Sequence, residues 1–138
     1  MKVFLETSAF AKRYVAEQRS DKVMALCLQA DSLAVSVICL LELISTLSRL
    51  VREKKLAKAD YRKLKHDAMA DLADVDICHI TPDVVVSVVS LLESHPLRAM
   101  DALHVACALA VETDIFVSAD RRQFSAARKA GLKIVDVS

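Results

Sequence analysis

Short apolar runs alternate with longer segments of helical periodicity along the 138-residue chain. Runs rich in β-branched and other apolar residues predict strands, and apolar side chains that recur every three to four positions predict helices. The predicted strands are residues 2–5, 32–37, 75–80, 115–118 and 133–137. The predicted helices are residues 9–17, 21–30, 38–52, 58–73, 81–93, 100–112 and 121–130.

This alternation predicts right-handed crossovers and a mostly parallel sheet that is covered by helices on both faces. We expect a single α/β domain over residues 1–138, with a central sheet of about five strands. The composition agrees, because 54% of the residues are hydrophobic but only 4% are aromatic, which predicts an aliphatic core and excludes intrinsic disorder. One glycine and two prolines leave little room for long irregular loops.

The cysteines and the apolar stretches bear on the cellular setting. The four cysteines form no C-x-x-C pair, have no histidine at zinc spacing and sit among apolar neighbours, so we expect buried free thiols. They are Cys27, Cys39, Cys78 and Cys107. The longest apolar stretch, residues 33–41, is too short to cross a bilayer, and no signal peptide precedes the first strand. We therefore expect a cytoplasmic protein with no membrane segment.

Four carboxylates occupy positions that composition alone does not explain. Glu6 follows the first predicted strand and Asp120 lies just past the fourth, where ligands bind in open α/β sheets. Glu42 and Asp101 each interrupt an apolar helical segment. Ionised carboxylates in apolar surroundings are costly unless they are paired, hydrogen-bonded or bound to a metal.

A divalent cation is one way to hold such carboxylates together, because it relieves their mutual repulsion. Oxygen ligands suit Mg²⁺ or Mn²⁺, and no cluster of cysteine and histidine indicates zinc. Such an ion can activate a water as a nucleophile toward a phosphodiester, and two ions can clamp both oxygens of an in-line displacement.

Helix capping is the alternative interpretation. All four carboxylates lie near predicted helix N-termini, where each stabilises the helix by about 0.3–1 kcal/mol. Asp120 and Gln123 resemble a capping box. Capping explains Glu42 poorly, since glutamate is a weak N-cap residue and its flanks are apolar. Spacing alone leaves both interpretations open.

The segments that carry the carboxylates add a more specific signal. They are Val3-Phe-Leu-Glu-Thr-Ser through Glu17, Leu40-Leu-Glu-Leu-Ile-Ser45, Leu97-Arg-Ala-Met-Asp-Ala-Leu-His-Val-Ala106 and Phe116-Val-Ser-Ala-Asp-Arg-Arg-Gln123. In order and spacing they resemble the four acidic motifs of PIN-domain (PilT N-terminus) nucleases, especially the VapC-type toxins of toxin–antitoxin pairs.

This resemblance implies a parallel sheet flanked by helices and an endoribonuclease that depends on Mg²⁺ or Mn²⁺. It assigns the metal-binding and catalytic roles to Glu6, Glu42, Asp101 and Asp120. It also implies an RNA substrate, a small antitoxin partner that holds the toxin inactive, and a possible homodimer.

The first motif departs from the family, which normally carries aspartate where this chain has Glu6. The extra methylene moves the carboxylate by about 1.5 Å, and Mg²⁺ demands near-ideal octahedral geometry. We expect metal binding to be retained with altered activity. The alternative is a degenerate PIN fold that does not cleave and instead binds RNA or a partner protein. A phosphoacceptor receiver domain would need paired acids after the first strand, which are absent.

Residues beside the carboxylates can support either interpretation. The hydroxyls of Thr7 and Ser118 can orient a carboxylate, or they can serve only as cap or turn residues. Arg98 can neutralise the acidic cluster or meet a phosphate, or it can be an ordinary surface arginine. His104, one turn after Asp101, is interpreted as a partly buried histidine with satisfied hydrogen bonds rather than as a metal ligand.

Basic residues gather in one part of the chain. Arg49 shares the face of Glu42 by i+7 spacing, which makes it a candidate for contact with a phosphate. The densest positive stretch follows: Arg52, Lys54, Lys55, Lys58, Arg62, Lys63 and Lys65. A solvated helix surface is the ordinary explanation, and contact with an RNA backbone is the functional one.

Overall fold

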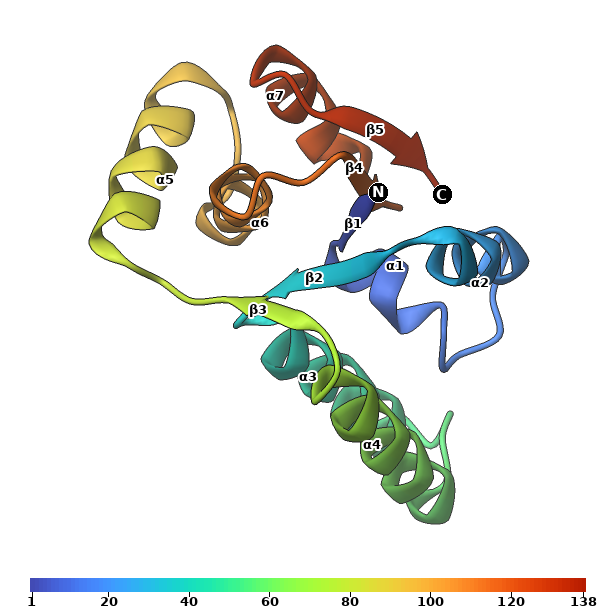
Figure 1. The fold of residues 1–138 in the computed structure, drawn as a ribbon. Helices are drawn as coiled ribbons and strands as arrows, with labels where there is room; N and C mark the ends of the chain where they lie inside the picture. Colours follow the sequence, from blue (N-terminus) through green and yellow to red (C-terminus); the bar gives the residue numbers. More distant parts are fainter.

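Five parallel strands form the centre of the computed structural model, which describes all residues 1–138 (Figure 1). The strands are β1 (Lys2–Leu5), β2 (Ser32–Ser36), β3 (Asp76–Cys78), β4 (Ile115–Ser118) and β5 (Lys133–Asp136). They are arranged in the order β3-β2-β1-β4-β5, and every neighbouring pair is parallel. The predicted α/β fold with a parallel sheet of about five strands is confirmed.

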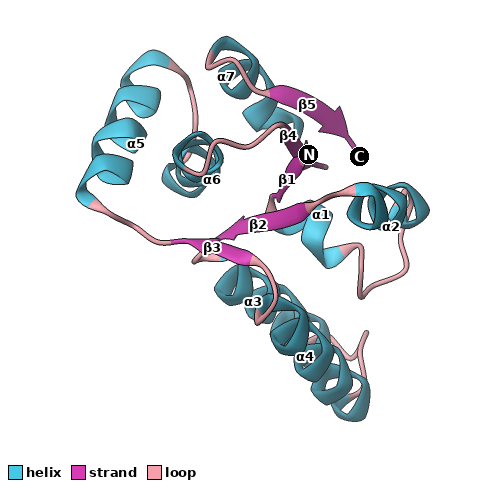
Figure 2. Ribbon diagram, in the orientation of Figure 1, coloured by secondary structure: helices cyan, strands magenta, loops and turns pink.

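Helices cover both faces of this sheet (Figure 2). They are α1 (Thr7–Ala11), α2 (Ser20–Gln29), α3 (Cys39–Arg52), α4 (Lys58–Leu72), α5 (Pro82–Ser94), α6 (Ala99–Ala110) and α7 (Phe124–Lys129), with a 3₁₀ turn η1 (Arg121–Gln123) before α7. Figure 1 shows α5, α6 and α7 on one side of the sheet, with α1, α3 and α4 on the other. The helices α3 and α4 pack side by side as a hairpin that extends away from the sheet.

Alternation of side chains along β1 supplies both halves of the core. Val3 and Leu5 point into one cluster, which also contains buried side chains of α1, α2, α3 and α4. Phe4 points into the opposite cluster, where it stacks on Phe116 with ring centroids 5.7 Å apart, and this cluster also contains buried side chains of α5, α6 and α7. Because β1 is buried on both faces, its sequence is a continuous apolar run rather than an alternating one.

The first helix is much shorter than predicted. The helical pattern over residues 9–17 gave one long helix, but α1 ends at Ala11, and tight turns carry the chain onward. Two contacts of the following residues explain this difference: the Tyr14 hydroxyl donates to Asp71 on α4 at 2.6 Å, and Arg13 pairs with the same carboxylate at 3.4 Å. Tertiary contacts therefore override the local periodicity here.

Other predicted boundaries differ by smaller amounts. The third strand is confined to Asp76–Cys78, and the last predicted helix divides into η1 and α7. Gly131 closes α7 at φ +95°, in the left-handed region that favours glycine, as the sequence predicts.

The cysteines and the helix lengths were also predicted from the sequence. All four cysteines are free, as expected, but Cys27 is only partly buried while the other three are buried. None of the helices combines the length and the apolar character that a membrane-spanning segment requires.

The strand order reverses between β1 and β4, because β2 and β3 lie on one side of β1 while β4 and β5 lie on the other. At such a switch point the connections leave in opposite directions and open a crevice at the carboxyl ends of the strands. The backbone N–H of Glu6 donates to the Val117 carbonyl at 3.0 Å, so the two strands stay paired up to this crevice.

Two leucines on α3 give a matched test of the core. Leu43 is fully buried, whereas Leu41 is 66% exposed on the same helix. We expect Leu43→Ala to lower the free energy of unfolding by about 2–5 kcal/mol, because it leaves a cavity, and Leu41→Ala to change it by less than about 0.5 kcal/mol. Urea denaturation followed by circular dichroism measures both, and equal losses would contradict the packing described.

Candidate metal and catalytic site

Glu6 lies at the carboxyl end of β1 and caps the N-terminus of α1. Its side chain bends over the start of this helix, so that Oε2 accepts the Ser8 backbone N–H at 3.0 Å and also the Ser8 hydroxyl. The Ser118 hydroxyl at the end of β4 donates to the same oxygen at 2.9 Å. Three donors therefore hold one oxygen of a carboxylate that is only 5% exposed.

Glu42 lies in the first turn of α3 and is held from two other elements. The Thr7 hydroxyl donates to Glu42 Oε1 at 2.5 Å, and His104 Nε2 lies 2.5 Å from the same oxygen. An ionised carboxylate can only accept, so His104 Nε2 carries the hydrogen of this bond. The contacts fix the direction of Glu42 although about a third of its side chain is exposed.

His104 connects the two glutamates from the centre of α6. Its side chain is 1% exposed, and its Nδ1 lies 3.1 Å from the Ser36 hydroxyl at the end of β2. Its Nε2 also lies 3.9 Å from Glu6 Oε1. Glu6, Glu42 and His104 each offer one possible ligand atom, and these atoms lie within 4.8 Å of one another. His104 is thus a histidine with satisfied hydrogen bonds, as predicted, but it is fully buried within the acidic site.

Asp101 lies one turn before His104 on α6 and is 7% exposed. Gln123 donates its side-chain amide to Asp101 Oδ1 at 3.3 Å. Asp101 Oδ2 is buried and makes no hydrogen bond to any protein group. A buried carboxylate oxygen without a partner is costly, so this atom fits a site that a cation completes.

Asp120 caps η1 and is paired with an arginine. Its Oδ1 accepts the Arg122 backbone N–H at 3.1 Å, while Arg122 Nε lies 2.9 Å from Oδ1 and Arg122 Nη2 lies 2.7 Å from Oδ2. Asp120 therefore caps the turn, but the predicted capping box with Gln123 is not formed: Asp120 accepts the N–H of Arg122 rather than that of Gln123, and the Gln123 side chain turns toward Asp101.

The pKa shifts follow these contacts. Burial alone raises the pKa of Glu42, but hydrogen bonds from His104 and Thr7 outweigh burial and bring this pKa below its usual value. The Arg122 guanidinium, chiefly through its hydrogen bonds, lowers the pKa of Asp120. The pKa of Arg122 is raised, first by its hydrogen bonds with Asp120 and then by the charges of Asp120, Asp101 and, least, Glu6.

The structure brings the predicted residues together unequally. Glu6 and Glu42 meet at His104, and the predicted supporting hydroxyls of Thr7 and Ser118 hold one glutamate each. Asp101 and Asp120 are outside this group of close ligand atoms, and each is held by its own partner, Gln123 and Arg122 respectively.

The two predicted supporting arginines stay outside these contacts. Arg49 and Arg98 are both exposed and make no ion pair with the carboxylates, although the charge of Arg98 acts on Asp120. Whether all four carboxylates bind a metal stays a prediction.

Several polar contacts of the site were not predicted from the sequence, among them those of Ser8 with Glu6 and of His104 with Glu42. Ser36, Gln123 and Arg122 orient His104, Asp101 and Asp120 respectively. Ser36 had a detectable signal, since it is a polar residue within an apolar strand segment, whereas Gln123 was predicted only as part of a capping box. The sequence gives no signal for the pairing of Arg122 with Asp120, because Arg121 beside it has the same side chain. In the structure Arg121 pairs with Asp136 instead.

The two neighbouring arginines give a test of the site's electrostatics. We expect Arg122→Gln to raise the pKa of Asp120 toward its usual value, because the guanidinium that stabilises the carboxylate is removed. A lowered pKa stabilises the fold above the unfolded-state pKa, and this stability is lost as pH falls through the folded-state pKa, so the variant loses less stability in acid. Carboxyl ¹³C NMR titration measures the shift. Arg121→Gln should leave Asp120 unchanged, and an equal shift would contradict the pairing.

Comparison with known proteins gives a consistent picture. Residues 3–130 match the PIN domain family. Two proteins of Mycobacterium tuberculosis, Ribonuclease VapC45 and Ribonuclease VapC49, are each 29% identical over 134 residues, which is 96% of this chain and 93% of each relative.

Solved structures share the fold at low sequence identity. FitAB bound to an IR36 DNA fragment has a TM-score of 0.71 at 13% identity, covering 97% of this chain and 94% of that one. VapBC2 from Rickettsia felis, bound to a DNA fragment from its promoter, has a TM-score of 0.70 at 15% identity over 100% of both chains. Mycobacterium tuberculosis VapC20, a Sarcin-Ricin loop cleaving toxin, has a TM-score of 0.68 at 19% identity, covering 94% and 95%. The family match over nearly the whole sequence places this chain in the PIN domain family.

Proposed function

We propose that this protein is a divalent-metal-dependent endoribonuclease that hydrolyses RNA phosphodiester bonds at the site formed by Glu6, Glu42, Asp101 and Asp120. The observation that carries the proposal is the buried Asp101 Oδ2, which has no protein partner. Oxygen ligands of this kind suit Mg²⁺ or Mn²⁺. In Glu6 and Glu42 the protein's hydrogen bonds engage one oxygen and leave the other for a cation.

The chain's own residues set the geometry of this site. Thr7 and His104 hold Glu42 Oε1, while Ser8 and Ser118 hold Glu6 Oε2, so the remaining oxygen of each carboxylate has a fixed direction. Such supporting contacts orient metal ligands and typically change metal affinity or activity by about 10–100-fold. A bound Mg²⁺ or Mn²⁺ would supply charge neutralisation and activation of water for attack on the phosphodiester.

The biological role we propose is that of a toxin inhibited by a small antitoxin protein. Two relatives are named VapC ribonucleases, and one fold neighbour is described as a toxin that cleaves the Sarcin-Ricin loop. One other neighbour is a toxin–antitoxin complex from Klebsiella pneumoniae, and another is described as a member of the VapBC family of toxin–antitoxin systems. These relatives support an RNA substrate and an antitoxin partner for this chain. The homodimer implied by the family resemblance stays a prediction.

The second candidate is a PIN fold that binds RNA or a protein partner without cleaving. One observation favours it: Glu6 is folded into the cap of α1, with three hydrogen bonds on a single oxygen. Those bonds hold the longer glutamate side chain in the cap, and they also restrain its carboxylate from moving toward a cation. Metal binding and cleavage, measured separately, distinguish the two candidates.

Asp101→Asn tests the proposed activity. We expect it to reduce RNA cleavage in Mg²⁺ or Mn²⁺ by a factor on the order of 100 or more, and to weaken Mn²⁺ binding measured by calorimetry, because the amide removes the charge at the unpartnered oxygen. Asp83→Asn is the matched control, since Asp83 also lies in the first turn of a helix but is exposed. Cleavage that survives Asp101→Asn would overturn the assignment of the site.

Glu6→Asp tests the departure from the family pattern. We expect the shorter side chain to raise cleavage in Mg²⁺ relative to Mn²⁺, because Mg²⁺ tolerates displaced ligands least. Aspartate also caps helices well, so the free energy of unfolding should change little. Cleavage rates and calorimetric affinities in each ion measure the effect, with exposed Glu93→Asp as the control. If neither quantity changes, Glu6 has no special influence on the metal preference.

A further inference from the structure

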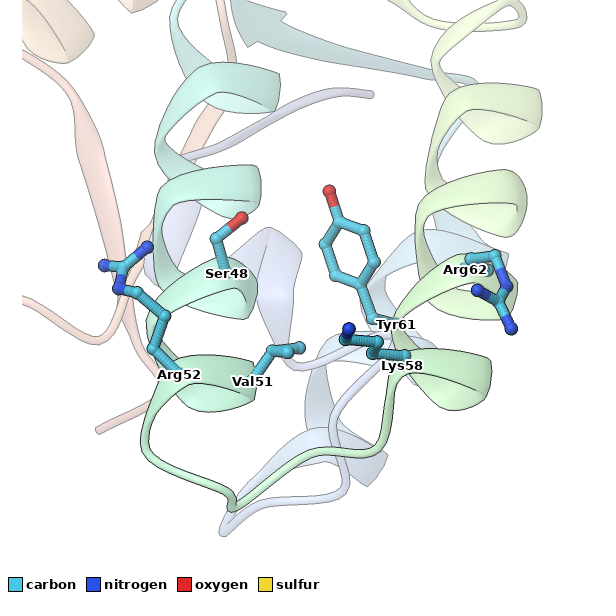
Figure 3. Close-up of a pocket in the computed structure, with 6 residues that line it drawn as sticks. All are labelled: Ser48, Val51, Arg52, Lys58, Tyr61 and Arg62. Carbon is cyan, nitrogen blue, oxygen red and sulfur yellow. The ribbon is translucent and has the colours of Figure 1, made fainter.

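A groove of about 370 Å³ lies between α3 and α4, in the half of the hairpin that is far from the sheet (Figure 3). It is lined by Ser48, Val51, Arg52, Lys58, Tyr61 and Arg62. Figure 3 shows the Tyr61 ring between the two helices, with Arg52 on the α3 side and Arg62 on the α4 side. Arg52 and Arg62 thus lie on opposite sides of the groove, with Lys58 beside Tyr61 between them, so the positive groups do not converge on one point.

The charge of this region differs from that of the rest of the chain. Residues 52–65 contain seven basic and two acidic side chains, while the whole chain has 19 basic and 18 acidic ones, so the remainder has four more acids than bases. Arg52, Lys58 and Arg62 make no ion pair; within residues 52–65 only Lys55 does so, with Glu53. The groove thus presents three cations whose charge no carboxylate neutralises, which is the electrostatic footprint of a polyanion site.

One side of α3 connects the groove to the carboxylates. Glu42, Ser45, Arg49 and Arg52 follow the spacing i, i+3, i+7 and i+10, which places them along one side of a helix. Ser45, Arg49 and Arg52 are exposed along this path. Ten residues of helix span about 15 Å, which corresponds to roughly four or five nucleotides of a stacked strand.

We propose that this groove binds the phosphate backbone of single-stranded RNA that extends from the proposed cleavage site along α3. The inference rests on the proposed function and names where its substrate is held. Cations on both sides of the groove fit a strand that crosses it, whereas a single small anion would need them to converge. The Tyr61 ring offers one face on which a base can stack without regard to sequence. The shared side of α3 favours RNA over an acidic protein segment.

The test compares two pairs of charge-removing substitutions in Asp101→Asn protein, so that cleavage does not interfere. The groove pair is Arg52→Gln with Arg62→Gln. The control pair is Lys54→Gln with Lys63→Gln, which removes the same charge from the same hairpin outside the groove. Glutamine keeps nearly the same helix propensity, so folding should be preserved. Fluorescence anisotropy gives the Kd for labelled RNAs of about two and about twelve nucleotides over a range of KCl concentrations.

We expect the groove pair to weaken binding of the longer RNA several-fold and to reduce the slope of log Kd against log salt by about 1.4, since each lost phosphate contact on a single strand removes about 0.7. Binding of the short RNA, which spans only the carboxylate site, should stay within about twofold. The control pair should change the slope for the longer RNA by clearly less.

Three outcomes would overturn the inference. Equal losses from both pairs would show that only the net charge matters, and unchanged binding in the groove pair would show that RNA does not use the groove. Polyglutamate that binds as tightly as RNA, with the same dependence on Arg52 and Arg62, would assign the groove to an acidic protein segment. Cleavage of the short RNA by protein with Asp101 intact tests the proposed function separately, because it does not require the groove.

Discussion

The parallel pairing of β1 with β4 is the contact on which the rest of the structure depends. It joins Val3, Phe4 and Leu5 to Ile115, Phe116 and Val117 across more than a hundred residues of sequence. The same pairing stacks Phe4 on Phe116 in one core and lets Ser118 reach the Glu6 carboxylate at the end of the strands. Core and site therefore form together, because one register sets both.

Accumulated negative charge is the second constraint on this crevice. The protein meets it with a different donor for each carboxylate: serine hydroxyls at Glu6, a threonine and a histidine at Glu42, an amide at Asp101 and a guanidinium at Asp120. Among the four carboxylates, only Asp101 has a buried oxygen that accepts no hydrogen bond from the protein. Such donors reduce the repulsion between neighbouring carboxylates, and the proposed cation would do the same at the remaining Asp101 oxygen.

Much of this arrangement can be predicted from the sequence, since local apolar runs show where the strands are. In a parallel sheet, a residue that closely follows a strand must lie at the carboxyl edge. Glu6 and Asp120 are predictable for that reason. The meeting of Glu42 with His104 is not, because it depends on how α3 and α6 approach from opposite faces of the sheet. Local periodicity also does not reveal that α1 ends early, because Arg13 and Tyr14, which come after it, contact Asp71 on a distant helix. The direction of the Glu6 side chain is equally hidden, since a glutamate at an N-cap can extend or fold back.

The long sequence separation between β1 and β4 also has a consequence for biosynthesis. The amino-terminal strand is made first, but it becomes the centre of the sheet only when residues 115–118 pair beside it. Closing so long a loop is entropically costly and slow compared with forming local contacts. During translation the partner strand for one side of β1 is still missing, and Glu6 lacks Ser118. The Glu6–Ser118 contact thus forms only after residues 115–118 have left the ribosome, so the cluster of carboxylates assembles late in the synthesis of these 138 residues.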